Sequence, residues 1–322
     1  MLLDRGNHVS MIKDLYRYVW KISARDQAIL SVLSVILFLL ELAPLELQRR
    51  IINGAVEGQA FEVIGLLCLL YVAAALVQGG LKLMLNIYRG SVSEAASQRL
   101  RLDTNLIAIA RSQKGREPGD EGVAISIVVS EVEAVGGFVG ASFSEPVLNG
   151  GILLSVFGYM MYMQPWMALV AFLLFCPQVV FIPFLQEAIN RRTKRRIETL
   201  RALSVDIVNE TADRAGARED TYRRRVGDVY RLNMQILRRK FGMNFLMNLL
   251  HHLGIIGILS VGGWLLLQGE TEVGTVVAFI SGLNRMNDPW GDMVNYFRDV
   301  TNAGVKYRLI AEAHDKRSPG PA

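Results

Sequence analysis

The sequence predicts an all-α membrane protein with six transmembrane helices and long helical extensions into the cytoplasm. Hydrophobic residues make up 51% of the 322 residues and charged residues 20%, so the mean hydropathy is positive, at +0.28. Charge is also segregated along the chain: Glu145 is the only charged residue between Glu133 and Glu187, whereas fifteen Lys and Arg residues lie between Arg191 and Lys240. Alternating apolar and basic blocks of this size are typical of multi-pass membrane proteins.

Six apolar stretches are candidates for the roughly 20 residues that a helix needs to cross a bilayer. In chain order they are Gln27–Leu47, Val63–Asn86, about Ala134–Met163, Trp166–Gln186, about Asn244–Leu267 and Val273–Leu283. The last stretch is short and is followed by polar residues that include Asn284, Arg285 and Asp288. Hydropathy alone therefore supports five spans and leaves the sixth to be decided by topology.

The distribution of basic residues favours six spans. The short connections near Ile52–Glu62, Met163–Pro165 and Leu267–Val273 carry no Lys or Arg, whereas the N-terminal segment and both long connections are rich in them. The positive-inside rule then places both termini and both long connections in the cytoplasm, which requires an even number of spans. Arg49 and Arg50 lie near the outer end of the first span, and we expect them to snorkel to that interface.

This topology divides the chain into three expected parts. Residues 1–26 form a cytoplasmic N-terminal segment, residues 27–312 a six-helix transmembrane domain and residues 313–322 a C-terminal tail. The long connections contain few helix breakers, so we expect the spans to continue as helices into the cytoplasm. Gly115, Pro118 and Gly119 mark a turn at the tip of the first connection.

Several function classes are disfavoured by composition. Cys68 and Cys176 lie inside apolar stretches, which argues against a disulfide framework. His251 and His252 point about 100° apart on a helix and have no nearby cysteine, so we expect no metal site. The basic run contains few aromatic residues and lies beside membrane spans, which favours contact with lipid head groups over nucleic acid. No catalytic arrangement of Ser, Cys and His is evident.

Polar residues inside the spans are candidates for a substrate pathway, because a charge at membrane depth is costly unless it faces protein or water. Many of them recur every three or four residues and so share a helix face. They are Glu41 and Glu46 in the first span, Gln78, Lys82 and Asn86 in the second, Ser142, Glu145 and Asn149 in the third, Asn244, Asn248 and His251 in the fifth, and Asn284, Asp288, Asp292, Asn295 and Asp299 in the sixth. We predict that these stripes line a water-filled cavity. The alternative for any single residue is an interhelical hydrogen bond or ion pair, such as Lys82 with a carboxylate.

Three parts of the chain resemble the transmembrane domain of type I ABC exporters. Gly269–Ile280 is similar to the start of that family's sixth helix. Gly122–Val135 is similar to the start of its third helix, although Ile127 stands near the place of a usual arginine. Leu42–Leu45 and Ile51–Gly54 are similar to its first outer hairpin. Taken in order and spacing, these stretches extend the resemblance over nearly the whole chain.

The resemblance implies a homodimer or heterodimer of such domains that forms a substrate pathway in the lipid bilayer. The family usually joins this domain to an ATPase domain, but no G-x-x-x-x-G-K-[ST] sequence occurs here, so we do not expect this chain to hydrolyse ATP alone. A separate ATP-binding subunit would hold ATP and Mg²⁺, and this chain would bind no cofactor itself. The expected location is a bacterial inner membrane.

The resemblance also places the ATPase contacts at the tips of the two long connections. The tip residues are Gly115, Arg116, Glu117, Glu210, Asp213, Arg214 and Arg218. The second tip, Asn209–Asp220, is more charged than the corresponding helix of the family. It would therefore dock through ion pairs, with less buried apolar area.

Two other interpretations remain open. One is a proton-driven transporter of similar fold without an ATPase, like bacterial peptide-uptake proteins, with Glu41, Glu46, Glu145 and the histidine pair as relay candidates. The other is a non-transporting membrane scaffold or regulatory partner, which would explain the unusual coupling tip.

Overall fold

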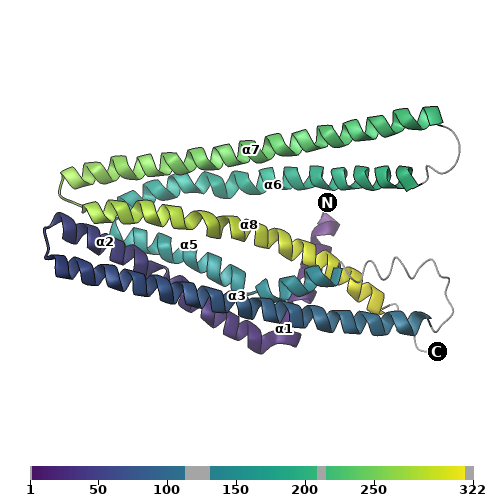
Figure 1. Cartoon of the computed structure of the whole chain (residues 1–322), viewed down its shortest axis with the longest axis horizontal. Helices are drawn as coiled ribbons and strands as arrows, with labels where there is room; N and C mark the ends of the chain where they lie inside the picture. Colours follow the sequence, from purple (N-terminus) through teal and green to yellow (C-terminus); the bar gives the residue numbers. More distant parts are fainter. Residues whose placement is uncertain (1, 113–130, 209–214, 316–322) are drawn as a thin grey trace. The chain divides into compact units, whose positions relative to one another are not determined.

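The computed structural model describes residues 2–112, 131–208 and 215–315, and in these ranges almost every residue is helical (Figure 1). No strand occurs in them, which confirms the all-α prediction for this part of the chain. The helices are α1 (Leu2–Leu40), α2 (Leu42–Val56), α3 (Phe61–Ser112), α5 (Ser144–Met163), α6 (Pro165–Val208), α7 (Ala215–Leu267) and α8 (Val273–Asp315). A further helical segment covers residues 131–141.

The chain divides into two compact units. The first unit comprises Met1–Met163 and Glu272–Ala322 and so contains α1, α2, α3, α5 and α8. The second unit comprises Gln164–Thr271 and consists of the antiparallel pair α6 and α7, which lie along each other in Figure 1.

Helix packing in the first unit combines a buried apolar core with close backbone approach. Leu30 of α1, Leu85 of α3 and Phe279 of α8 are completely buried. Gly140, near the end of the segment at 131–141, lies against α3: a Cβ atom there would be 2.4 Å from the carbonyl oxygen of Arg89. Such contacts are typical of membrane helices, where small residues let backbones meet.

In the second unit, α6 and α7 each have an apolar segment and a polar segment. Gly257 of α7 packs against Val170 and Leu174 of α6, and a Cβ atom there would lie 2.9 Å from a methyl group of each. The part of α6 after Gln186 and the part of α7 before Asn244 are polar and helical. This agrees with the expectation that the spans continue as helices beyond their apolar stretches.

Five helices in the described part are long and apolar enough to cross a membrane. They are Lys13–Val56, Phe61–Asp103, Ser144–Met163, Pro165–Leu200 and Tyr222–Leu267. Several apolar helices of this length are compatible with a multi-pass membrane protein, and they coincide with the five stretches that hydropathy supports. Helix α8 is long enough but more polar, so the sixth span stays a prediction.

Two predicted spans are not single helices. The first, Gln27–Leu47, is interrupted at Glu41 between α1 and α2, and the third, about Ala134–Met163, is interrupted at residues 142–143. The predicted loop at Ile52–Glu62 is also shorter than expected, because α2 runs to Val56 and α3 begins at Phe61. Gly58, with φ of 72°, forms this turn in a conformation that favours glycine. The expected boundary at residue 26 falls inside α1, which has a kink at Ser23.

Candidate functional site

The two helix breaks of the first unit have the same local cause. Each is followed by a proline at the third position of the next helix, Pro44 in α2 and Pro146 in α5. Proline has no N–H to donate to the carbonyl four residues earlier, which belongs to Leu40 in one case and Ser142 in the other. Its ring also crowds that carbonyl, which favours a bend or a break at this point.

Side chains from other helices satisfy the carbonyl groups that the break before α5 exposes. The Tyr296 hydroxyl of α8 donates a 2.5 Å hydrogen bond to the Ser142 carbonyl oxygen. Gln27 Nε2 of α1 donates to the Val139 carbonyl oxygen at 2.8 Å. The buried Ser34 hydroxyl of α1 donates to the Ser144 carbonyl oxygen at 3.2 Å and so ties the start of α5 to α1. Because an unpaired carbonyl at membrane depth costs several kcal/mol, these donors hold the break in place.

Replacing Tyr296 by phenylalanine should therefore destabilise the first unit by about 1–3 kcal/mol, because it leaves the buried Ser142 carbonyl without its donor. The change also removes a hydrogen bond between the hydroxyls of Tyr296 and Tyr16. Thermal unfolding of the purified protein in mild detergent would measure the effect. Tyr162→Phe is the control, since Tyr162 is 86% exposed. A Tyr296→Phe protein as stable as this control would show that the hydrogen bond is dispensable.

Each break also carries a carboxylate that is paired with an arginine of a different helix. At the first break, Arg285 Nη1 of α8 lies 2.5 Å from Glu41 Oε2, and the Glu41 side chain is only 13% exposed. At the second break, Arg89 Nη1 of α3 lies 3.2 Å from Glu145 Oε1. Both carboxylates are predicted pathway residues, whereas neither arginine was predicted to contribute to a site.

The Arg89 guanidinium has donor capacity that the described residues do not use. Its Nε and Nη2 atoms are buried and have no hydrogen-bond partner in the part of the chain that the structure describes. Asp292 of α8 acts electrostatically on both Arg89 and Glu145, so the second pair faces the predicted polar stripe of α8. A partly desolvated guanidinium with free donors is suited to bind a carboxylate or a phosphate group.

A second charged network joins α2, α5 and α8 at the predicted outer end of the first unit. Glu46 accepts hydrogen bonds from Arg49, Arg50 and Tyr159, at distances between 2.6 and 3.0 Å. Arg49 also contacts Glu272 at 2.9 Å. The Arg49 side chain is mostly buried and is held by two carboxylates, and its expected snorkelling to the interface stays a prediction.

The other predicted pathway residues occupy the faces that their spacing indicated. Those on α8 are all exposed and form one stripe: Asn284, Asp288, Asp292, Asn295 and Asp299. On α3, Lys82 and Asn86 are exposed and Gln78 is half-buried. Among the described residues Lys82 forms no ion pair with a carboxylate. On α5, Asn149 is buried. The structure thus brings the α5 and α8 stripes together through Glu145 and Asp292.

The polar residues of α7 belong to the second unit. Asn244 and Asn248 are exposed, and His251 is half-buried with its ring 5.7 Å from that of His252. Among the described residues, no group of three or more His, Cys, Asp or Glu side chains could hold a metal ion.

Most of the predicted ATPase-coupling residues lie outside the described residues. These are Gly115, Arg116, Glu117, Glu210, Asp213 and Arg214. Arg218 lies within the first turns of α7. The sequence-based prediction of the two tips is therefore untested.

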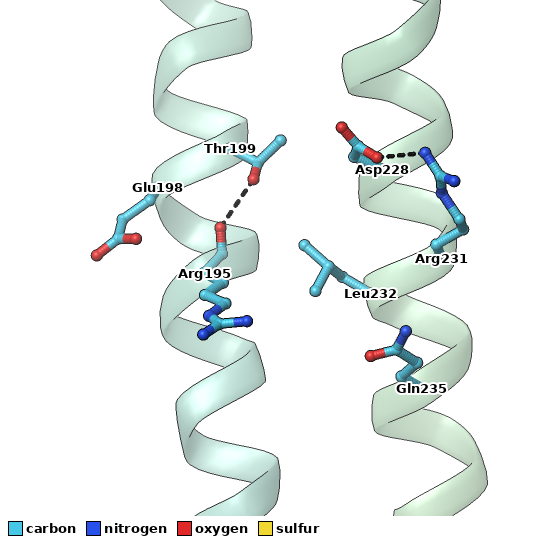
Figure 2. Close-up of a pocket in the computed structure, with 7 residues that line it drawn as sticks. All are labelled: Arg195, Glu198, Thr199, Asp228, Arg231, Leu232 and Gln235. Carbon is cyan, nitrogen blue, oxygen red and sulfur yellow. Dashed lines mark hydrogen bonds and ion pairs between the residues drawn. The ribbon is translucent and has the colours of Figure 1, made fainter.

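Figure 2 shows a groove of about 510 Å³ between the polar halves of α6 and α7. It is lined by Arg195, Glu198, Thr199, Asp228, Arg231, Leu232 and Gln235. Arg231 and Asp228 form an ion pair at 2.5 Å, and the two arginines and two carboxylates of the lining balance in charge. The groove as a whole therefore offers no net attraction for a charged ligand.

No protein-family model matches the sequence. The function has to be argued from the geometry of the first unit, where two helix breaks carry carboxylate–arginine pairs and the second pair faces an exposed polar stripe. Irregular backbone at membrane depth is tolerated where it is buried in protein or lines a water-filled cavity, and discontinuous helices form the binding sites of many transporters.

Proposed function

We propose that the chain is the membrane-spanning subunit of an ABC exporter-like transporter. It would form the substrate pathway as a dimer and be driven by ATP hydrolysis on a separate nucleotide-binding subunit. The observation that carries the transport part of this proposal is the second helix break, where Arg89 pairs with Glu145 within electrostatic range of Asp292 in the exposed stripe of α8. The type of transporter rests on the sequence resemblance.

The exposed stripe of α8 supports a pathway that one copy does not complete. Asp288 and Asp292 are exposed and follow the apolar part of the predicted sixth span on the same helix. Carboxylates at membrane depth need water or a protein partner, because lipid solvates them poorly. A second copy of the chain would enclose the stripe and keep it hydrated.

The two ion pairs also provide contacts that a transport cycle can break and remake. Glu41–Arg285 joins the α1–α2 break to α8, and Arg89–Glu145 joins α3 to α5. Switching transitions commonly exchange discrete ion pairs between packed helices. Opening either pair would release a helix at its break, where the backbone is already interrupted.

The proton-driven alternative ranks second. Its relay candidates Glu41, Glu46 and Glu145 each contact an arginine in the structure. A proton relay through these carboxylates would require the pairs to open first. The scaffold interpretation gives no role to an arginine with free donors beside a polar stripe.

Cysteine accessibility would test whether the stripe lines a pathway. Asn284→Cys and Asp292→Cys, each made in a Cys68→Ser, Cys176→Ser background, should react with a membrane-impermeant maleimide in native membranes. The wild-type protein supplies the control, because Cys68 is exposed on the apolar part of α3 and should be shielded by lipid. Unreactive cysteines at both stripe positions, with or without ATP, would remove the support for a water-filled pathway.

A further inference from the structure

The second unit carries an unneutralised group of arginines just beyond the apolar part of its two helices. Arg192 of α6 donates to the Gln235 side chain of α7 at 3.2 Å and to the Ala188 carbonyl at 2.9 Å. Both acceptors are neutral, so they orient the guanidinium without cancelling its charge. The hydrogen bond to Gln235 also fixes the pairing of α6 with α7 at this level.

Three further guanidinium groups lie close enough to repel that of Arg192, namely those of Arg191, Arg195 and Arg239. We call these four residues the arginine layer. Glu187 contacts Arg191 at 3.6 Å, but both side chains are largely exposed, so this pair is weak. Figure 2 shows the Arg195 guanidinium group lying along α6, away from the Glu198 carboxylate. The layer therefore keeps a net positive charge.

The next turn of α6 holds a buried donor without an acceptor. Arg196 Nη1 donates to Asn233 Oδ1 at 3.3 Å, again a neutral partner. The Nε atom of Arg196 is buried and has no hydrogen-bond partner in the described part of the chain. Two arginines on successive turns are thus positioned by amide side chains, and among the described residues these two guanidinium groups form no ion pair with a carboxylate.

The position of the layer along the helices indicates which anion would reach it. Arg192 lies about 9 Å beyond Gln186, the last uncharged residue of the fourth predicted span, and Arg239 lies about 7.5 Å from Asn244 at the start of the fifth. The head-group region of a bilayer extends roughly 5–8 Å beyond the hydrocarbon on each side. Arginine side chains reach back over such distances, so the guanidinium groups meet the phosphate level.

The surface on the membrane side of the layer is apolar. Phe184 of α6 and Phe245 of α7 are 69% and 68% exposed, and they lie within two turns of Arg191 and Arg239. An acyl chain can cover these rings while its phosphate contacts the arginines. Free phosphate would gain nothing from the aromatic surface.

We infer that the arginine layer of the second unit is a binding site for anionic phospholipids of the cytoplasmic leaflet. Clusters of basic residues directly cytoplasmic of membrane spans attract such lipids. The inference rests on the α6–α7 pair alone and holds whether or not the chain is a transporter.

The test compares lipid binding by the full-length protein in nanodiscs of phosphatidylcholine with and without phosphatidylglycerol. Phosphatidylglycerol should raise the melting temperature of the wild type, and native mass spectrometry should detect retained lipid. The variant R192Q/R195Q/R239Q should bind phosphatidylglycerol at least about tenfold more weakly. R192K/R195K/R239K should keep most of the binding, because it keeps the charge.

The matched control is R223Q/R224Q/R225Q, which removes the same charge from α7 about 20 Å farther from the membrane. It should bind phosphatidylglycerol like the wild type. Three outcomes would overturn the inference: no effect of phosphatidylglycerol on the wild type, equal loss in the control and layer variants, or the same stabilisation by inorganic phosphate in phosphatidylcholine nanodiscs.

Discussion

Replacing Arg285 by glutamine should destabilise the protein by about 3–5 kcal/mol, because the change leaves Glu41 charged and without its partner at membrane depth. Arg285 lies about 18 Å along α8 from its start, near the middle of a 30 Å hydrocarbon core if α8 spans the membrane. The Glu41 side chain is 13% exposed, so water compensates little for the loss. Denaturant unfolding of the purified protein in mild detergent would measure the change.

The double variant E41Q/R285Q shows whether the stability lost in R285Q comes from breaking the ion pair. Removing both charges should recover at least half of the stability that R285Q loses, because no charge is then left unpaired. Arg298→Gln is the control on the same helix, since the Arg298 side chain is 47% exposed and should be nearly neutral to replace. If the double variant lost as much stability as the two single variants together, Glu41 and Arg285 would not be coupled, which would contradict the ion pair.

Replacing Gly274 by alanine should have the next largest effect, about 1–3 kcal/mol or more, because a Cβ atom there would collide with the backbone of α2. It would lie 2.3 Å from the Arg49 carbonyl oxygen and 2.5 Å from Asn53 Oδ1. The Gly274 N–H also donates to Asn53 at 2.7 Å, and this contact would be lost. We expect α8 to move away from α2 and the Arg49–Glu272 ion pair to open.

Gly291→Ala is the matched control in the same helix, since a Cβ atom at Gly291 meets nothing within 4 Å. This substitution should leave the melting temperature unchanged or raise it slightly, because alanine favours the helix. Equal effects of the two alanines would show that α2 and α8 are not in backbone contact at Gly274.

The helical architecture could be predicted from the sequence because apolar length and charge segregation are local properties. Five spans and the extension of α3, α6 and α7 beyond them follow directly from these patterns. The breaks within the first and third spans also had a local signal, since Pro44 and Pro146 each remove a backbone hydrogen bond across the break. Hydropathy averages over such positions, so it gave single long spans instead.

The site itself could be predicted only in part. Glu41 and Glu145 were identifiable because isolated carboxylates in apolar stretches are rare. Their partners were not identifiable: Arg285 is 244 residues from Glu41 in sequence, and Arg89 is 56 residues from Glu145. The same holds for Tyr296, whose hydroxyl satisfies a carbonyl on another helix. Such pairings depend on how the helices pack, which single-sequence patterns do not contain.

The most direct test of the proposed function is purification of the chain from its native membrane in mild detergent, followed by identification of the proteins that co-purify. The proposal predicts a stoichiometric ATPase subunit that carries the phosphate-binding loop this chain lacks, together with two membrane-spanning subunits. A stable dimer of this chain with no ATPase would contradict the proposal and would favour proton-driven transport instead.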